Sequence, residues 1–166
     1  MEKNLLFLFL ILLIFIFSTK IFSSEKELIG ELTPDQILAE LPEWKKLADQ
    51  YSPQFEIIQK LNQVNQEISI EIILGTWCKD SKQHVPSFIK IIQMIDNPSI
   101  SVRLIGVPKK KETRDKRLIE EKNIKRIPTF IVCLNGEEKG RIIETPTLSI
   151  EEDLFTIIQS QTSNSK

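Results

Sequence analysis

The sequence predicts an α/β fold with a mixed central sheet, and two observations carry that prediction. Segments rich in β-branched residues alternate with segments of helical periodicity, which gives the order β-α-β-α-β-β-α behind a helical lead-in. Strand-helix-strand units are typical of parallel strands. An Asn-Gly pair at residues 135–136 indicates a β-hairpin, which adds an antiparallel pair. With 166 residues, the chain is long enough for one domain of ordinary size.

Residues 1–24 carry a segment typical of export. Leu5–Phe17 is an unbroken apolar run of 13 residues, preceded by Lys3 and followed by Ser18 and Thr19. A spanning helix needs about 20 apolar residues, whereas the core of a signal peptide needs about 7–15. We expect a cleaved signal peptide or a membrane anchor formed by residues 5–22, with a buried core helix as the remaining alternative. The first two place the folded part outside the cytoplasm, periplasmic or secreted, where disulfides form.

Residues 25–67 are expected to form an N-terminal helical elaboration. Thr33-Pro34-Asp35-Gln36 has the pattern of a helix start, with an N-cap, a proline at the first position and a capping box. Pro42 should bend or divide the helix that follows. Ser52-Pro53 is expected to start a further helix in the same manner.

Residues 68–160 are expected to form the main domain, followed by a disordered polar tail at 161–166. The first strand is a continuous β-branched run that ends at Gly75, which suits burial on both faces. The Lys109–Lys111 run is interpreted as a solvated loop, and Ser149 opens a capping box. Strands are expected at Ile68–Leu74, Ile100–Val107, Thr129–Leu134 and Gly140–Ile143, and helices at Ser81–Ile95, at Glu112–Lys122 and from Ser149 onward.

Composition excludes several classes of function. Lysine and arginine number 22 against 23 aspartate and glutamate, so the chain lacks the basic excess that binds nucleic acid. Contact with a membrane is expected only through the N-terminal segment. Two cysteines and one histidine cannot supply a disulfide scaffold, or a four-ligand zinc site unaided. We therefore predict no metal and no cofactor.

Cys78 lies between the end of a buried strand and the start of a helix. A helix N-terminus presents unpaired amide donors and a partial positive charge, and both favour a thiolate over a thiol. Lys79 would strengthen this effect, whereas Asp80 would oppose it or serve as a local base. Cys78 is therefore a candidate nucleophile, with an inert, half-buried thiol as the alternative.

Four separated features of residues 68–159 resemble the thioredoxin superfamily. Trp77-Cys78 matches the opening of the active-site motif, and Pro86 matches the proline that kinks the active-site helix. Ile127-Pro128-Thr129 matches the loop whose proline is cis and faces the reactive cysteine. Asn135-Gly136-Glu137 matches the hairpin turn after the next strand. The resemblance implies a thioredoxin-like three-layer α/β/α fold, with the N-terminal helices as an extension, and thiol-disulfide exchange at Cys78.

The resemblance also implies a substrate-binding role for residues beside the thiol. In the family, the proline that corresponds to Pro128 exposes adjacent backbone for strand-like pairing with a substrate polypeptide. Ile127 belongs to the same loop, and Trp77 would shield the thiol and contact substrate. An ordinary trans proline and a simple packing tryptophan are the alternatives.

Two departures from the family pattern restrict the chemistry. Ser81 stands where the Cys-x-x-Cys motif has its second cysteine, and an alcohol does not exchange with disulfides. Ser81 could still donate a hydrogen bond to the Cys78 thiolate. Ile72 stands where thioredoxins usually keep a buried aspartate. A self-contained dithiol reductase is therefore not expected.

Two further residues have candidate roles. Cys133 lies five residues after Pro128, and we expect a buried structural thiol there, beyond the ~7 Å Cα separation that a disulfide allows. His84, one turn beyond Ser81, could tune the thiol or shuttle a proton. A partly packed helical histidine is the alternative reading of that position.

The leading hypothesis is an exported protein that acts by monothiol exchange on protein or small-molecule disulfides through Cys78. The second thiol would come from the substrate, which gives isomerase-like behaviour, or from a partner or small thiol. The alternative is a redox-silent module that binds a peptide or partner. A thiol peroxidase role is less favoured, because no Thr/Arg activation pattern surrounds Cys78.

Overall fold

The computed structural model describes residues 26–160 of the chain. The export segment predicted at residues 1–24 and the disordered tail predicted at residues 161–166 lie outside the described residues. Within residues 26–160, none of the helices combines the length and the apolar character that crossing a bilayer requires.

Within this part of the chain, five strands form one mixed sheet in the order β1-β3-β2-β4-β5. The central strands β2 and β3 run parallel, while the pairs β1–β3, β2–β4 and β4–β5 are antiparallel. The predicted parallel unit and the predicted hairpin are both confirmed. The strands are β1 (Gly30–Leu32), β2 (Ile68–Leu74), β3 (Ile100–Gly106), β4 (Thr129–Leu134) and β5 (Glu137–Ile143).

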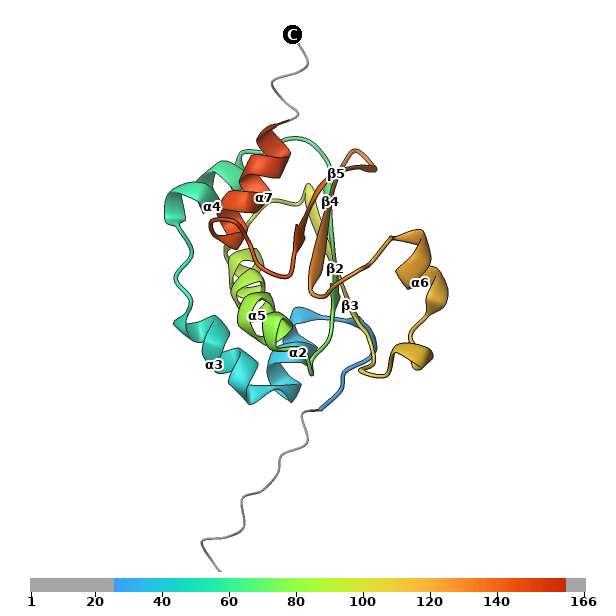
Figure 1. Cartoon of the computed structure of the whole chain (residues 1–166). Helices are drawn as coiled ribbons and strands as arrows, with labels where there is room; N and C mark the ends of the chain where they lie inside the picture. The colour runs from blue at the N-terminus through green and yellow to red at the C-terminus, as the bar shows by residue number, and fades with distance from the viewer. Residues whose placement is uncertain (1–25, 161–166) are drawn as a thin grey trace, which may run out of the picture.

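Helices cover both faces of the sheet, which confirms the thioredoxin-like three-layer α/β/α arrangement. Figure 1 shows α5 and α7 on one face and α6 on the other. The N-terminal helices pack on the first of these faces, since α3 contacts α5 and α4 contacts α7. The helices are α2 (Pro34–Glu40), α3 (Pro42–Gln50), α4 (Phe55–Asn62), α5 (Lys79–Met94), α6 (Lys116–Glu121) and α7 (Ile150–Gln159), with a 3-10 turn at Lys111–Thr113.

Strand β2 is apolar along the face that α5 and α7 cover. The predicted burial on both faces holds only at its C-terminal end, because Ser69 is exposed and Glu71 is half-buried on the α6 face. Ile72 is fully buried in the larger core cluster, together with Phe88 of α5 and Phe130 of β4, whose rings lie 5.4 Å apart. Ile73 is fully buried in a smaller cluster on the α6 face. The end of the strand that leads to Cys78 is thus fixed between two apolar layers.

The start signals of the N-terminal helices are partly confirmed. Thr33 and Gln36 form the predicted capping box, and Pro42 divides the helical stretch into α2 and α3. The helix expected to start at Ser52-Pro53 instead begins at Phe55, because the backbone of Gln54 is still extended (φ -68°, ψ 108°). The backbone N–H of Gln54 donates to the buried carboxylate of Glu151 (3.0 Å).

Two further elements differ from expectation. The helix predicted over residues 112–122 is divided into the 3-10 turn and α6, because the Asp115 carboxylate caps a new helix by accepting from the backbone N–H of Arg117 (2.9 Å). Strand β1 was not predicted, since three residues are too few to show a period of two.

Candidate functional site

The turn between β2 and α5 holds Cys78 where its sequence position predicts. The backbone N–H of Cys78 donates to the carbonyl of Gly75 (2.9 Å), which closes the turn. Cys78 is itself the N-cap of α5, and its carbonyl accepts from the N–H of Lys82 (3.0 Å). The thiol is half-buried at the N-terminus of a 16-residue helix, where the helix dipole favours negative charge.

The loop before β4 approaches the thiol from the other side. The Ile127–Pro128 peptide bond is cis, as the resemblance implied. The Cys78 Sγ donates to the carbonyl of Ile127 at 3.4 Å, and the loop is held in turn by the Thr129 hydroxyl, which donates to the carbonyl of Arg126 (2.6 Å). The fold thus places residue 127 against a thiol 49 positions earlier in the chain.

Trp77 forms a fixed wall beside the thiol. Its indole Nε1 donates to the carbonyl of Val107 at 2.9 Å, and the guanidinium of Arg114 lies over its ring, 5.3 Å from the ring centroid. The indole also lies close to Gly75, where a Cβ would come within 2.7 Å of a ring carbon. The ring is therefore held by a hydrogen bond, by the Arg114 guanidinium and by close packing against Gly75.

Ser81 is fully buried, and the hydrogen bond found for it runs to the backbone. Its Oγ accepts from the N–H of Gly75 at 3.2 Å, which ties the first turn of α5 to the end of β2. Because the Ser81 oxygen is the acceptor in this hydrogen bond, the hydrogen of its hydroxyl group can still be donated to another acceptor. Donation from Ser81 to a Cys78 thiolate stays a prediction.

The three candidate modulators divide between different surfaces. Asp80 lines the same groove as Cys78, whereas Lys79 is exposed. His84 lines a separate hollow with Tyr51 and Ser149 and does not join the groove. Burial lowers the pKa of His84 below its ordinary value, and the charge of Asp80 opposes that shift.

Cys133 is half-buried rather than fully buried, which corrects the expectation of a core thiol. It lies on β4 opposite Ser69 of β2 and packs at the margin of the smaller cluster on the α6 face, which that short helix covers only in part. Five residue steps of β2 separate Ser69 from Leu74, which is about 16 Å in a strand. Cys133 and Cys78 are therefore too far apart to pair, and both thiols are free.

A groove of about 240 Å³ opens beside Cys78. Its apolar floor comes from Trp77, Ile119, Ile124 and Ile127, while charged groups form its rim. Of this rim only Asp80 was predicted, because the basic residues come from the segments on either side of α6 and lack a motif. The charged groups are Asp80, Lys111, Arg114, Lys125, Arg126 and Glu144.

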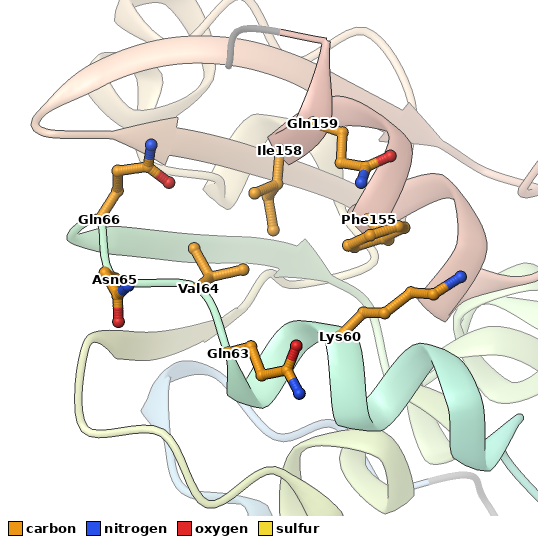
Figure 2. A pocket seen from close by; sticks show the side chains of 8 residues that line it. All are labelled: Lys60, Gln63, Val64, Asn65, Gln66, Phe155, Ile158 and Gln159. Atoms are coloured by element: carbon orange, nitrogen blue, oxygen red, sulfur yellow. The ribbon is translucent and has the colours of Figure 1, made fainter. Parts of the chain in front are cut away.

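A larger hollow of about 480 Å³ lies between α4 and α7 (Figure 2). It is lined by amide side chains around an apolar patch that includes Phe155, and the ammonium of Lys60 lies 5.5 Å from the centroid of that ring. Gln66, which precedes β2, lines this hollow, whereas Cys78 follows the other end of β2. The larger hollow is therefore remote from the thiol.

Comparison with known proteins agrees with this arrangement. The family model described as Thioredoxin matches residues 35–153. A crystal structure of a protein of unknown function from Pseudomonas aeruginosa is similar, with a TM-score of 0.54 and 16% identity over 79% of this chain and 87% of that chain. An HIV epitope-scaffold is similar to the same extent, with a TM-score of 0.53, 16% identity and the same coverage. Among curated protein sequences, none matches. With its family match spanning most of the chain, this protein belongs to the thioredoxin superfamily.

Proposed function

We propose that this protein performs monothiol thiol-disulfide exchange through Cys78. One observation carries the proposal: the Cys78 thiol lies at the N-terminus of α5, opens onto a groove and contacts the Ile127 carbonyl at 3.4 Å. A thiol in this setting is accessible and lies in the field of a helix dipole, and both properties favour attack on a disulfide.

The exchange has two steps. In the first, the Cys78 thiolate attacks one sulfur of a substrate disulfide, so that a mixed disulfide forms and the other substrate sulfur leaves as a thiolate. In the second, a thiolate from outside the site attacks the substrate sulfur of the mixed disulfide and releases the Cys78 thiolate. The protein is neither oxidised nor reduced over the cycle.

The thiol of the second step has to come from another molecule. Ser81 carries an alcohol, and Cys133 lies about 16 Å or more along the sheet from the turn. A thiol of the substrate itself would give isomerisation. A partner or small thiol would leave one substrate sulfur in a mixed disulfide with that thiol, and attack by a second such thiol would complete the reduction. An extracytoplasmic location, periplasmic or secreted with or without a retained anchor, fits this chemistry because disulfides are formed there.

A turnover assay with matched variants tests the proposal. The purified protein is incubated with a disulfide-linked reporter peptide and reduced glutathione, and release of the reporter is followed. Turnover is expected in the wild type and in Cys133→Ala, and it should fall to the uncatalysed rate in Cys78→Ala. Equal release by the wild type and Cys78→Ala would refute exchange through this thiol.

A redox-silent binding module is the second candidate, and two residues favour it. Ile72 is apolar where the family usually keeps a proton-transferring aspartate, and the observed hydrogen bond of Ser81 runs to Gly75 rather than to Cys78. This candidate expects Cys78→Ala to bind a peptide ligand as tightly as the wild type, with no turnover by either protein.

A further inference from the structure

We propose that the groove beside Cys78 selects disulfides that are flanked by carboxylates. The inference rests on the proposed exchange function and adds a substrate class to it. Two adjoining hollows carry it, one of about 240 Å³ that contains Cys78 and one of about 310 Å³ next to α6. The two hollows share Lys111, Arg114, Ile119, Ile124 and Lys125, so they form one continuous surface, which we call the basic groove.

Positive charge is concentrated on the basic groove although the whole chain has a formal net charge of -1. Five cationic side chains line it among the described residues, against three carboxylates. The cations are Lys111, Arg114, Lys116, Lys125 and Arg126, and the carboxylates are Asp80, Glu120 and Glu144. Such a local excess attracts anionic ligands and raises their rate of association.

Arg114 is the cation that the fold holds in place. Its Nε donates to the carbonyl of Pro108 (2.9 Å), and a terminal nitrogen donates to the carbonyl of Lys109 (3.3 Å). Its guanidinium also lies over the Trp77 ring, which borders the thiol. Because neutral carbonyls and an aromatic face hold this group, its positive charge stays available to a ligand in the groove.

The carboxylates of the groove leave this excess in place. Glu144 forms an ion pair with Arg126 at 2.6 Å, and this contact raises the pKa of Arg126. The two charges of the pair cancel, so the excess of positive charge over the rest of the groove is unchanged. Asp80 stands on the first turn of α5, beside the thiol. It would repel a carboxylate placed directly at the sulfur, so the flanking carboxylates of a substrate should lie toward the α6 side, near Lys111 and Lys125.

The test compares two disulfide-linked peptide pairs of the same length, one with Glu and one with Lys on both sides of each Cys. The rate of mixed-disulfide formation with Cys78 is divided by the rate of each peptide with 2-mercaptoethanol, which removes their intrinsic difference in reactivity. The Glu pair should react about tenfold faster at low ionic strength. The ratio should approach one in 1 M salt, where the Debye length is about 3 Å.

Charge reversal at the exposed rim locates the effect. The double variant Lys111→Glu/Lys125→Glu should lose the preference for the Glu pair and favour the Lys pair. The single variants Lys111→Glu and Lys125→Glu should each weaken the preference. Lys60→Glu is the control matched to them in charge, because Lys60 lies at the larger hollow by the other end of β2, and this variant should show the preference of the wild type. A preference that survives the double variant, or that Lys60→Glu removes equally, would overturn the inference.

The same peptides with Ser in place of Cys separate this inference from the proposed function. Tighter binding of the Glu analogue than of the Lys analogue, without reaction of either disulfide pair, would refute exchange and would support only a preference of the basic groove for acidic peptides. Reaction of both disulfide pairs at equal corrected rates would support exchange and overturn the substrate class. Glutathione disulfide, a small disulfide that carries carboxylates, serves as a third substrate and shows whether a polypeptide is required.

Discussion

Gly75 is the residue whose substitution tests most sharply how the thiol turn is built. In a Gly75→Ala variant the new Cβ would lie 2.7 and 2.9 Å from two carbons of the Trp77 ring and 2.8 Å from the Ile127 Cδ1. The end of the Ile127 side chain can rotate away. The rigid indole has to move as a whole, by roughly 0.7 Å or more to reach ordinary contact distance.

The cost of this movement follows from the contacts that it breaks. Overpacking costs about 1–3 kcal/mol, and loss of the 2.9 Å hydrogen bond from Trp77 to Val107 costs about 0.5–1.5 kcal/mol. Alanine lowers the conformational entropy of the unfolded chain relative to glycine, which offsets about 0.4–1 kcal/mol of this destabilisation. The net loss of stability should be about 2 kcal/mol, which lowers Tm by roughly 5–10 °C for a domain of this size.

The variant should also slow exchange, because the indole borders the thiol and packs against the guanidinium of Arg114. A displacement of this size is expected to lower the rate of mixed-disulfide formation by about tenfold. Gly140→Ala is the control, since the atoms nearest to its Cβ would be those of the Ile157 side chain at 3.0–3.3 Å, away from the groove. Thermal unfolding and the exchange rate are measured for both. An unchanged Tm and rate in Gly75→Ala would refute the account of this wall.

Three further predictions concern α5 and its neighbours. Ser81→Cys should form a disulfide with Cys78 on oxidation and release substrate adducts without added thiol; adducts that persist in mass spectra would contradict this. Glu151→Ala should lower the free energy of unfolding, measured in urea, by about 2–4 kcal/mol. The reason is that the buried carboxylate accepts hydrogen bonds from the Tyr51 hydroxyl (2.8 Å) and from a backbone N–H. A loss below about 0.5 kcal/mol, which is typical of a surface substitution, would refute that role. Burial lowers the pKa of His84 in the folded state below the unfolded value of about 6.5, so its contribution to stability is present above that pH and is lost as the pH falls toward the lowered pKa. His84→Gln should therefore lose less stability than the wild type between pH 7.5 and pH 5, and an equal loss in both proteins would contradict this.

Much of the fold follows from local sequence signals. The run Ile68–Leu74 is apolar at every position that faces α5 and α7, so the burial of that face was predictable. The Asn135-Gly136 pair supplies the two positive φ angles, 50° and 80°, that a tight hairpin requires. Trp77-Cys78 and Pro128 were found because the family keeps them at fixed spacing.

The features that escaped prediction depend on tertiary contacts. Strand β1 exists through its pairing with β3, and three residues carry no periodic signal of their own. Arg114 reaches the thiol site because loop carbonyls and the Trp77 ring hold it, and no pattern around residue 114 indicates this. The basic groove could not be predicted from the composition, because positive and negative residues are nearly equal in number over the whole chain. It forms because the segments around α6 bring several of the basic residues together in the folded structure.

Identification of the sulfur that carries a trapped substrate tests the central claim most directly. Reduced protein is mixed with a disulfide-linked reporter peptide, the reaction is quenched with acid, and the adduct is located by peptide mass spectrometry. The account predicts an adduct on Cys78, formed at the same rate in Cys133→Ala and absent in Cys78→Ala. An adduct on Cys133, or equal labelling of both cysteines, would contradict it.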